Sequence, residues 1–475
     1  MPPDPRGYAE RHFSRFVGEL AQLVRIPSVS SDPRHAQDVA DCAGWLAWHM
    51  RDTGLADVRL LPTASHPLVF ATTPPRPGRP VVLVYGHYDV QPAGRLEQWR
   101  TQPFEPVVRG GEWLHGRGAA DDKGQLFVHL KAVESWLRSG GPPVQVKILL
   151  EGEEEIGSPN LAAALHAHRG LLHADIAIAS DSPMPAPGRP VITCAMRGSV
   201  GLEIEVRSAA ADLHPGIFGG AVPDSIQVLC HILAGLQDGS GRVAVPGFYD
   251  AVRNVSREER RALAAKGPTD AQIMRDARAV AAWGEPRFTL FERSTLRPSL
   301  TVTGIRGGHQ GPGDRMVLAA RAAARIKVRL VADQDPSSMA ALLRRHIAEL
   351  APPYVRVRLR FGRGTRPYRV VVSHPLVRAA VRACTRGFAA SPVLLPMGGS
   401  IAAIPLLEDV LAIPSVLVGF ALPGDGKHGP NERFHLPTFR RAIATSILFL
   451  EECAAAPSPA SGIRRAVHPL AKEIA

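Results

Sequence analysis

Three apolar runs constrain the fold of this chain most, because each of them gives way at once to acidic or histidine side chains. They lie within Pro80–Val90, Val144–Leu150 and Ala174–Asp181. Short continuous apolar runs predict strands that are buried on both faces. Helical patterns alternate with them at Gln125–Arg138 and Leu161–His168. The alternation predicts an α/β sheet with helices on both faces, which delivers polar side chains at the ends of its strands.

The pattern changes after Met196 and returns near Ser373, which predicts that one domain interrupts another. The 475 residues also exceed what one ordinary hydrophobic core accommodates. We therefore expect a catalytic domain in two parts, a smaller inserted domain and a flexible tail. Their predicted ranges are 1–196 with 373–453 for the catalytic domain, 197–372 for the insertion and 454–475 for the tail.

Inside the predicted insertion, Leu202–Val206 and Ala324–Val331 alternate apolar and polar residues with a period of two. This alternation is typical of a sheet with one exposed face. Two further stretches, Asp224–Leu236 and Val317–Ala324, are expected to form helices between the strands. The segment Gly239–Trp283 shows no clear pattern.

Composition argues against several classes of partner. The chain has 56 Lys and Arg against 44 Asp and Glu, but no basic block is longer than two residues, whereas nucleic-acid binding needs clustered charge. No apolar run approaches the ~18 residues of a membrane helix, and residues 1–11 lack the apolar core of a signal peptide. The five cysteines include no CxxC pair, which argues against a disulfide framework. We expect a cytoplasmic protein that binds neither nucleic acid nor membranes.

Reactive side chains gather at the predicted strand ends and in two glycine-rich loops. His87 and Asp89 lie two residues apart on an extended segment, so both point to one side, where the imidazole can bind a metal ion and the carboxylate can orient it. The other groups are Asp121 and Asp122, the acidic residues from Glu151 to Glu155, Asp181, and His428. Taken singly, each has an ordinary structural alternative: a hydrogen-bonded histidine, a solvated turn, or an acidic helix N-terminus.

Taken together, these groups form the ligand inventory of a two-metal site. Two divalent ions that share one carboxylate need two histidines, one bridging Asp and two terminal carboxylates. The chain supplies this inventory with His87, Asp121, Glu155, Asp181 and His428. Glu154 is left over as a general base.

Seven motifs, in this order, resemble the signatures of dimetal metallopeptidases of the carnosinase/aminoacylase type. They are GHYDVQP (86–92), GRGAADDKG (116–124), EGEEEIGS (151–158), DLHPGIFGG (212–220), KVRLVADQDP (327–336), GGSI (398–401) and GKHGPNE (426–432). That family includes glutamate carboxypeptidase, acetylornithine deacetylase and succinyl-diaminopimelate desuccinylase. The first and fourth motifs are similar to its cytosolic dipeptidase-like branch. The resemblance implies a mixed-sheet α/β/α catalytic domain with an inserted α+β lid and dimerisation domain.

The resemblance also implies a role for each matching residue of the catalytic part. The metal ligands would be His87 and Asp181 on one ion, Glu155 and His428 on the other, and Asp121 between them. A cis peptide bond would join Asp121 to Asp122, and Asp89 would orient His87. Glu154 would take a proton from the attacking water and later deliver it to the leaving amine. The two ions per subunit would be zinc, with manganese or cobalt as alternatives.

In the inserted domain the resemblance implies residues that hold the substrate. His214 would reach into the partner subunit of a homodimer and hydrogen-bond the developing oxyanion. Arg329 would clamp the free carboxylate of the substrate, aided by backbone donors at Gly398, Gly399 and Ser400.

The implied activity is hydrolysis of dipeptides, at the peptide bond next to a free C-terminal carboxylate, by a hydroxide that bridges the metals. The Asp at position 181 resembles dipeptidases and aminopeptidases, which have Asp as this terminal metal ligand. Carboxypeptidases and deacylases of the family have Glu there. Deacylation of N-acyl or N-carbamoyl amino acids by the same chemistry is the alternative. A non-catalytic binding protein on this scaffold would lack the base or a ligand, and all of them are present here.

Overall fold

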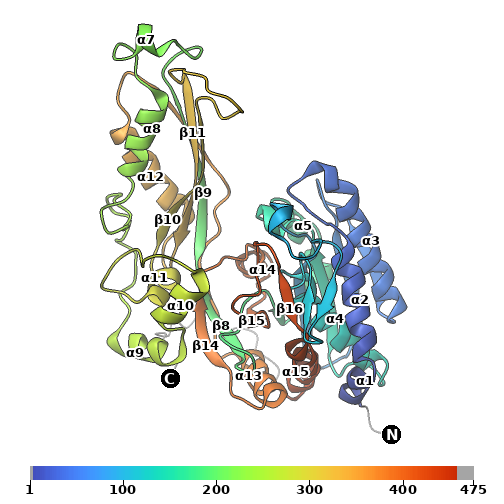
Figure 1. The fold of residues 1–475 in the computed structure, drawn as a ribbon. Coiled ribbons are helices and arrows are strands. Elements are labelled where there is room, and N and C mark those ends of the chain that lie inside the picture. The colour runs from blue at the N-terminus through green and yellow to red at the C-terminus, as the bar shows by residue number, and fades with distance from the viewer. Residues whose placement is uncertain (1–3, 457–475) are drawn as a thin grey trace. The chain divides into compact units, whose positions relative to one another are not determined.

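The computed structural model describes residues 4–456, and the chain divides into two compact units (Figure 1). Within the described residues, the first unit comprises residues 4–194, 370–395 and 401–456, and the second comprises Ala195–Arg369 and Pro396–Ser400. The last of these segments was expected in the catalytic part. It groups with the second unit because Arg197 donates a hydrogen bond to the Gly398 carbonyl oxygen at 2.8 Å. The predicted tail lies, from residue 457 onward, outside the described residues.

The sheet of the first unit is mixed, with the order β1-β2-β6-β3-β7-β15-β8 and with β14 beside β8. Its strands are β1 (Ala56–Leu61), β2 (Leu68–Thr72), β3 (Val81–His87), β6 (Gln145–Glu151), β7 (Ile176–Ala179), β8 (Val191–Met196), β14 (Val393–Met397) and β15 (Ser415–Gly419). The central strands β6, β3, β7 and β15 run parallel, whereas β1, β2 and β8 pair antiparallel. The predicted mixed α/β architecture is confirmed.

Helices of the first unit pack in two groups. One group contains α1 (Pro5–Arg11), α2 (Phe13–Arg25), α4 (Lys123–Leu137), α13 (Pro375–Phe388) and α15 (Leu436–Ala455), and the other contains α5 (Leu161–Ala167), α6 (Arg169–Leu172) and α14 (Ala403–Leu411). A further helix, α3 (Ala36–Asp52), packs against β1 and β2. A separate three-stranded sheet joins β4 (Val107–Arg109), β5 (Trp113–His115) and β16 (Arg433–His435).

The parallel register of the central strands brings their carboxyl ends to one edge of the sheet. His87, the last residue of β3, lies opposite Glu151, the last residue of β6. Asp181 follows two residues after the end of β7, which pairs with the other side of β3. The apolar bodies of these strands are buried, so the sheet presents its polar groups at this edge.

The second unit is built on an antiparallel sheet with the order β10-β11-β9-β12. Its strands are β9 (Gly198–Arg207), β10 (Ser299–Gly307), β11 (Arg321–Leu330) and β12 (Arg356–Phe361). The helices α8 (Ser225–Ala234) and α12 (Pro336–Leu350) contribute apolar side chains to the same core as the strands. The remaining helices are α7 (Pro215–Phe218), α9 (Arg257–Lys266), α10 (Asp270–Ala277) and α11 (Leu290–Thr295).

One predicted helix of the second unit is wrong. Residues Val317–Ala324 were expected to be helical, but from Arg321 onward they belong to β11. This strand is central in its sheet and hydrogen-bonds to β9 on one side and β10 on the other. Pairing on both sides overrides the helix propensity of its alanines.

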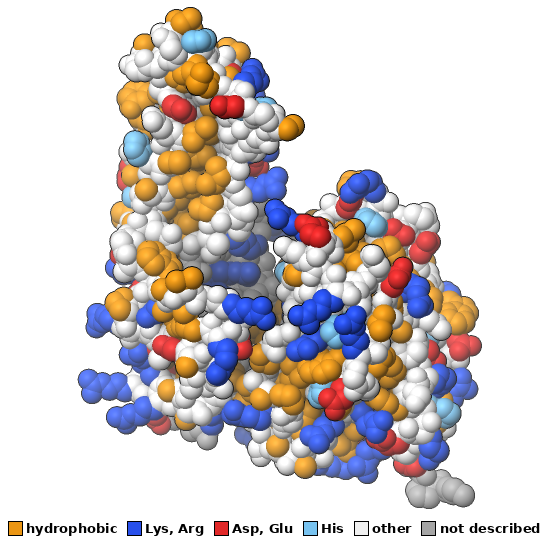
Figure 2. Space-filling model, in the orientation of Figure 1, with side chains coloured by type: hydrophobic (Ala, Val, Ile, Leu, Met, Phe, Trp, Pro, Cys, Tyr) orange, Lys and Arg blue, Asp and Glu red, His pale blue; other side chains and the backbone are white. Residues whose placement is uncertain are grey.

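Within residues 4–456 no helix is both long enough and apolar enough to cross a membrane. Lys and Arg side chains are spread over both units on the face drawn in Figure 2, with acidic side chains among them.

Candidate metal centre

His87 is buried at the end of β3 and is held at one ring nitrogen only. Its Nδ1 lies 3.1 Å from the main-chain oxygen and 3.4 Å from the carboxylate Oδ1 of Asp89. Its Nε2 has no hydrogen-bond partner among the described residues, although it is buried. Buried polar groups are nearly always satisfied, and a histidine fixed through Nδ1 commonly binds a metal ion through Nε2. The environment of His87 therefore fits a metal ligand.

Asp89 connects His87 to the segment that carries the predicted base. Its carboxylate accepts a hydrogen bond from Ser30 Oγ at 2.6 Å and from the backbone N–H groups of Glu154 and Glu155 at 3.1 Å each. Both of these residues belong to the short helix η3 (Glu154–Ile156). One buried carboxylate thus sets the position of the imidazole and of η3 together.

The five predicted ligands come together as two half-sites that share Asp121. In the His87 half-site, His87 Nε2 lies 3.4 Å from Asp121 Oδ1 and 3.8 Å from Asp181 Oδ2. In the His428 half-site, His428 Nε2 lies 3.1 Å from Asp121 Oδ2 and 3.3 Å from Glu155 Oε2. A tetrahedral ion with bonds of about 2.0–2.1 Å separates its ligand atoms by about 3.3 Å. The donor atoms are thus spaced for one ion in each half-site.

The loop before Asp121 is held by Glu432, a buried residue to which the sequence analysis assigned no role. Its carboxylate accepts hydrogen bonds from the Arg117 guanidinium and from the backbone N–H groups of Gly118, Ala120 and Asp121. The predicted cis peptide bond joins Asp121 to Asp122. Glu432 is the last residue of the motif that contains His428. Its position in that motif was the sequence feature that could have indicated its role.

Burial and charge set different protonation tendencies in the site. Burial opposes the ionisation of Asp121, but the ammonium of Lys427 and hydrogen bonds from His428 and His87 hold its pKa well below the usual range. Burial raises the pKa of Glu154 well above the usual range. A carboxyl group with a raised pKa accepts a proton more readily than an ordinary carboxylate, which suits a general base.

Lys427 is part of the site, and the sequence analysis missed it. Its Nζ lies 2.5 Å from Asp181 Oδ1 and 3.4 Å from Asp121 Oδ1. Burial opposes its charge, but these two carboxylates hold the pKa of Lys427 well above the usual range. The sequence feature that could have indicated this role is the position of Lys427 directly before His428.

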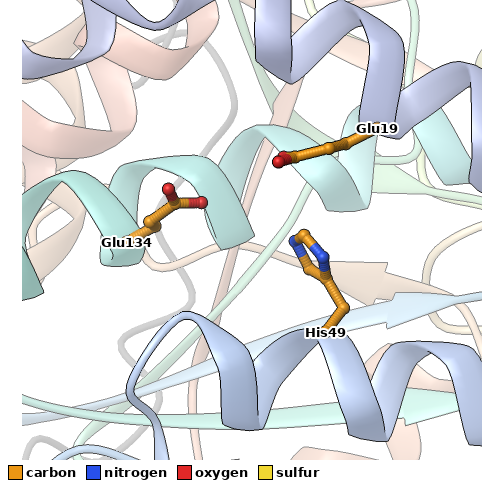
Figure 3. Close-up of side chains that lie close together, drawn as sticks. All are labelled: Glu19, His49 and Glu134. Carbon is orange, nitrogen blue, oxygen red and sulfur yellow. The ribbon is translucent and has the colours of Figure 1, made fainter.

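Glu19, His49 and Glu134 form a third group of potential metal ligands (Figure 3). The fully buried ammonium of Lys131 already lies among them, with Nζ at 2.5 Å from Glu19 Oε2 and at 2.7 Å from both His49 Nε2 and Glu134 Oε2. Burial and the adjacent ammonium lower the pKa of His49 to about 3, so its neutral ring accepts a hydrogen bond from Lys131. This group is an internal ion cluster rather than a metal centre.

Replacing Lys131 by alanine should lower the free energy of unfolding by about 3 kcal/mol, because it leaves Glu19 and the buried Glu134 with only the partly exposed Arg15 as a cationic partner. Urea unfolding followed by circular dichroism measures the change. Arg386→Ala is the matched control, since Arg386 forms an exposed ion pair with Glu452 and should contribute less than about 1 kcal/mol. Equal, small effects of the two substitutions would contradict the prediction.

The predicted substrate-binding residues belong to the second unit. His214 is exposed, and its Nδ1 accepts a hydrogen bond from the backbone N–H of Gly216 at 3.1 Å, which leaves the proton on Nε2. Arg329 donates to Ser400 Oγ at 2.8 Å, so the structure brings the predicted clamp and the GGS segment together. Gly398 is required there, because a Cβ would lie 2.2 Å from a backbone oxygen.

Arg197 is a second guanidinium beside Arg329 that the sequence analysis missed. Burial and the charge of Arg329 lower the pKa of Arg197 to about 10. The main-chain oxygen of Arg197 accepts a hydrogen bond from Ser400 Oγ at 2.5 Å. Two guanidinium groups beside one glycine-rich segment form a local environment that favours an anion.

Comparison with known proteins assigns this arrangement to one group. The model of peptidase family M20/M25/M40 matches residues 83–452. Beta-Ala-His dipeptidase of Rattus norvegicus is 27% identical over 448 residues, which cover 90% of each chain. Cys-Gly metallodipeptidase DUG1 of Candida albicans is 28% identical over 455 residues, which cover 91% of this chain and 93% of the relative.

Two solved structures share the fold over almost the full length. The dipeptidase Dug1p from Saccharomyces cerevisiae superposes with a TM-score of 0.87 at 25% identity, over 96% of this chain and 98% of the other. Human carnosine dipeptidase 1 superposes with a TM-score of 0.86 at 26% identity, over 96% of this chain and all of the other (100%).

Proposed function

Because the chain belongs to peptidase family M20/M25/M40, we propose that it is a metal-dependent dipeptidase that cleaves the peptide bond next to a free C-terminal carboxylate. The observation that carries this proposal is the pair of half-sites around Asp121, with an orphaned Nε2 on His87. Relatives named as dipeptidases that match about nine-tenths of the chain support the substrate class.

We propose that two divalent ions, zinc first and manganese or cobalt as alternatives, bind in the two half-sites. The ligands would be His87, Asp121 and Asp181 in one, and Asp121, Glu155 and His428 in the other. Ions held there would polarise the scissile carbonyl and lower the pKa of an attacking water toward about 7. The mixed imidazole and carboxylate donors suit all three metals.

Glu154 takes a proton from the attacking water and returns it to the leaving amine. Its burial supports this role, because the raised pKa of this carboxyl group makes it a stronger base toward the attacking water than an ordinary carboxylate. Asp89 contacts both the backbone N–H of Glu154 and the ring of His87. These contacts fix the position of the proposed base relative to the proposed ligand His87. The catalytic residues that we propose are Glu154, Asp89 and His214.

The first unit is the proposed catalytic domain, and the second is the proposed lid and dimerisation domain. His214 would act on the site of a partner subunit, where an exposed Nε2–H can donate to the developing oxyanion. Arg329, with the backbone of Gly398, Gly399 and Ser400, would bind the carboxylate of the substrate. The hydrogen bond between Arg329 and Ser400 supports this grouping.

Replacing His214 by alanine should lower kcat by about 10²–10³-fold without loss of metal, because it removes a donor to the oxyanion. Steady-state kinetics and metal analysis measure the two effects. Mixing this variant with inactive Glu154→Ala chains should restore part of the activity, since each hybrid dimer keeps one intact combination of base and donor. No recovery, despite demonstrated subunit exchange, would show that His214 does not act across a dimer.

We also propose a cytoplasmic location. Cys42, Cys384 and Cys453 are buried as thiols, which is typical of proteins in a reducing compartment.

The experiment that tests the function is amino-acid release from a mixed panel of dipeptides, N-acyl amino acids and N-carbamoyl amino acids. Each reaction contains Zn²⁺, Mn²⁺ or EDTA, with Glu154→Ala as the blank. We expect release from dipeptides that is lost with EDTA. Release from the N-acyl or N-carbamoyl compounds alone would show that the protein is a deacylase and not a dipeptidase. Release from none of the compounds would refute the proposed hydrolytic activity.

A further inference from the structure

We propose that Lys427 is an internal cation that competes with the metal ion of the His87 half-site and lowers the affinity of that half-site for metal. The inference rests on the proposed function, since it assumes that both half-sites bind metal. It concerns a residue that is not a ligand.

The ammonium of Lys427 contacts carboxylates that the His87 half-site needs. Its Nζ lies 2.5 Å from Asp181 Oδ1, while the other oxygen of the same carboxylate faces His87. It lies 3.4 Å from Asp121 Oδ1, the oxygen that is also 3.4 Å from His87 Nε2. An ammonium and a divalent ion would therefore draw on the same two carboxylates, and their like charges repel each other at this range.

The His428 half-site is arranged differently. It uses the other oxygen of Asp121, Oδ2, together with Glu155. The Oε2 atom of Glu155 accepts a hydrogen bond from the neutral amide of Gln91 at 2.8 Å. Its Oε1 is buried without a hydrogen-bond partner among the described residues. The competition by Lys427 therefore falls mainly on the His87 half-site.

In the cluster around Lys131, an ammonium group occupies the whole space between potential metal ligands. There the ammonium is fully buried, and its three partners surround it completely enough that no metal is needed. The side chain of Lys427 is 27% exposed, so it has a route to solvent that Lys131 lacks. A metal ion can displace Lys427 at a cost in affinity, whereas it cannot displace Lys131.

The test measures metal retention by the zinc-loaded protein, without substrate. The protein is dialysed against buffers of decreasing free zinc, and zinc per chain is measured by mass spectrometry. In Lys427→Met, which keeps the length of the side chain without its charge, we expect one of the two release steps to move to at least about tenfold lower free zinc. The other step should move by less than about threefold.

Two controls identify the cause and the half-site. Lys427→Arg keeps the positive charge and should release zinc as the unmodified chain does. In His87→Ala, the step that Lys427→Met shifts should be absent, while the other step remains. Lys427→Gln repeats the test if the methionine variant unfolds, as judged by circular dichroism.

Two bound zinc ions with release steps that neither Lys427→Met nor Lys427→Gln changes would overturn the inference and leave the proposed function standing. An equal shift of both steps would also overturn it, because the effect would not belong to one half-site. A chain that retains no zinc, or only one ion in every variant, would overturn the inference together with the two-metal function.

Discussion

Glu154→Ala should lower kcat by about 10²–10⁴-fold, the usual contribution of a general base, while the protein keeps its full metal content. The two effects separate because the donor atoms of both half-sites come from other residues. Turnover of the best dipeptide and zinc per chain, measured on the same preparation, check the prediction.

Glu154→Gln is the matched control, because it preserves the size of the side chain and removes only its ability to accept a proton. We expect the same loss of turnover as in the alanine variant. Normal activity in either variant would exclude Glu154 as the base. Loss of zinc in both would instead show that Glu154 holds metal.

Asp121→Ala should abolish activity and remove metal from both half-sites, because each takes one oxygen of this carboxylate. We expect zinc affinity to fall by more than the roughly 10–100-fold that loss of an outer-shell partner costs. Zinc retention during dialysis measures it. The matched control is Asp181→Ala, which should weaken only the His87 half-site. If Asp121→Ala released a single ion, Asp121 would not be shared.

The sequence carried strong signals wherever the determining interactions are local. The buried strand before His87 and its spacing of two to Asp89 depend on neighbouring residues, so the strand end and the orientation of this pair could be predicted. The change of sequence pattern near Met196 likewise lies close to Ala195, where the second unit begins. Signals for α9 and α10 were present and overlooked, since both helices open with capping boxes, Ser256 with Glu259 and Thr269 with Gln272.

Other features depend on contacts between distant parts of the chain. Residues 396–400 join the second unit through Arg197, about two hundred positions away, and no local pattern marks that contact. The Ala-rich start of β11 is a strand because partners pair with it on both sides. A weak local preference yields to several tertiary hydrogen bonds in such a case.

By itself, the sequence determined the inventory of candidate ligands: which carboxylates and imidazoles follow buried strands, and in what order. The tertiary structure decided which cationic side chains lie beside those carboxylates and neutralise their charge. Lys427 meets Asp181 across 246 positions, and Arg117 meets Glu432 across 315. Such charges interact only after β7 has paired with β15 in the large sheet and β5 with β16 in the small one, because the electrostatic interaction depends on distance in space and on burial.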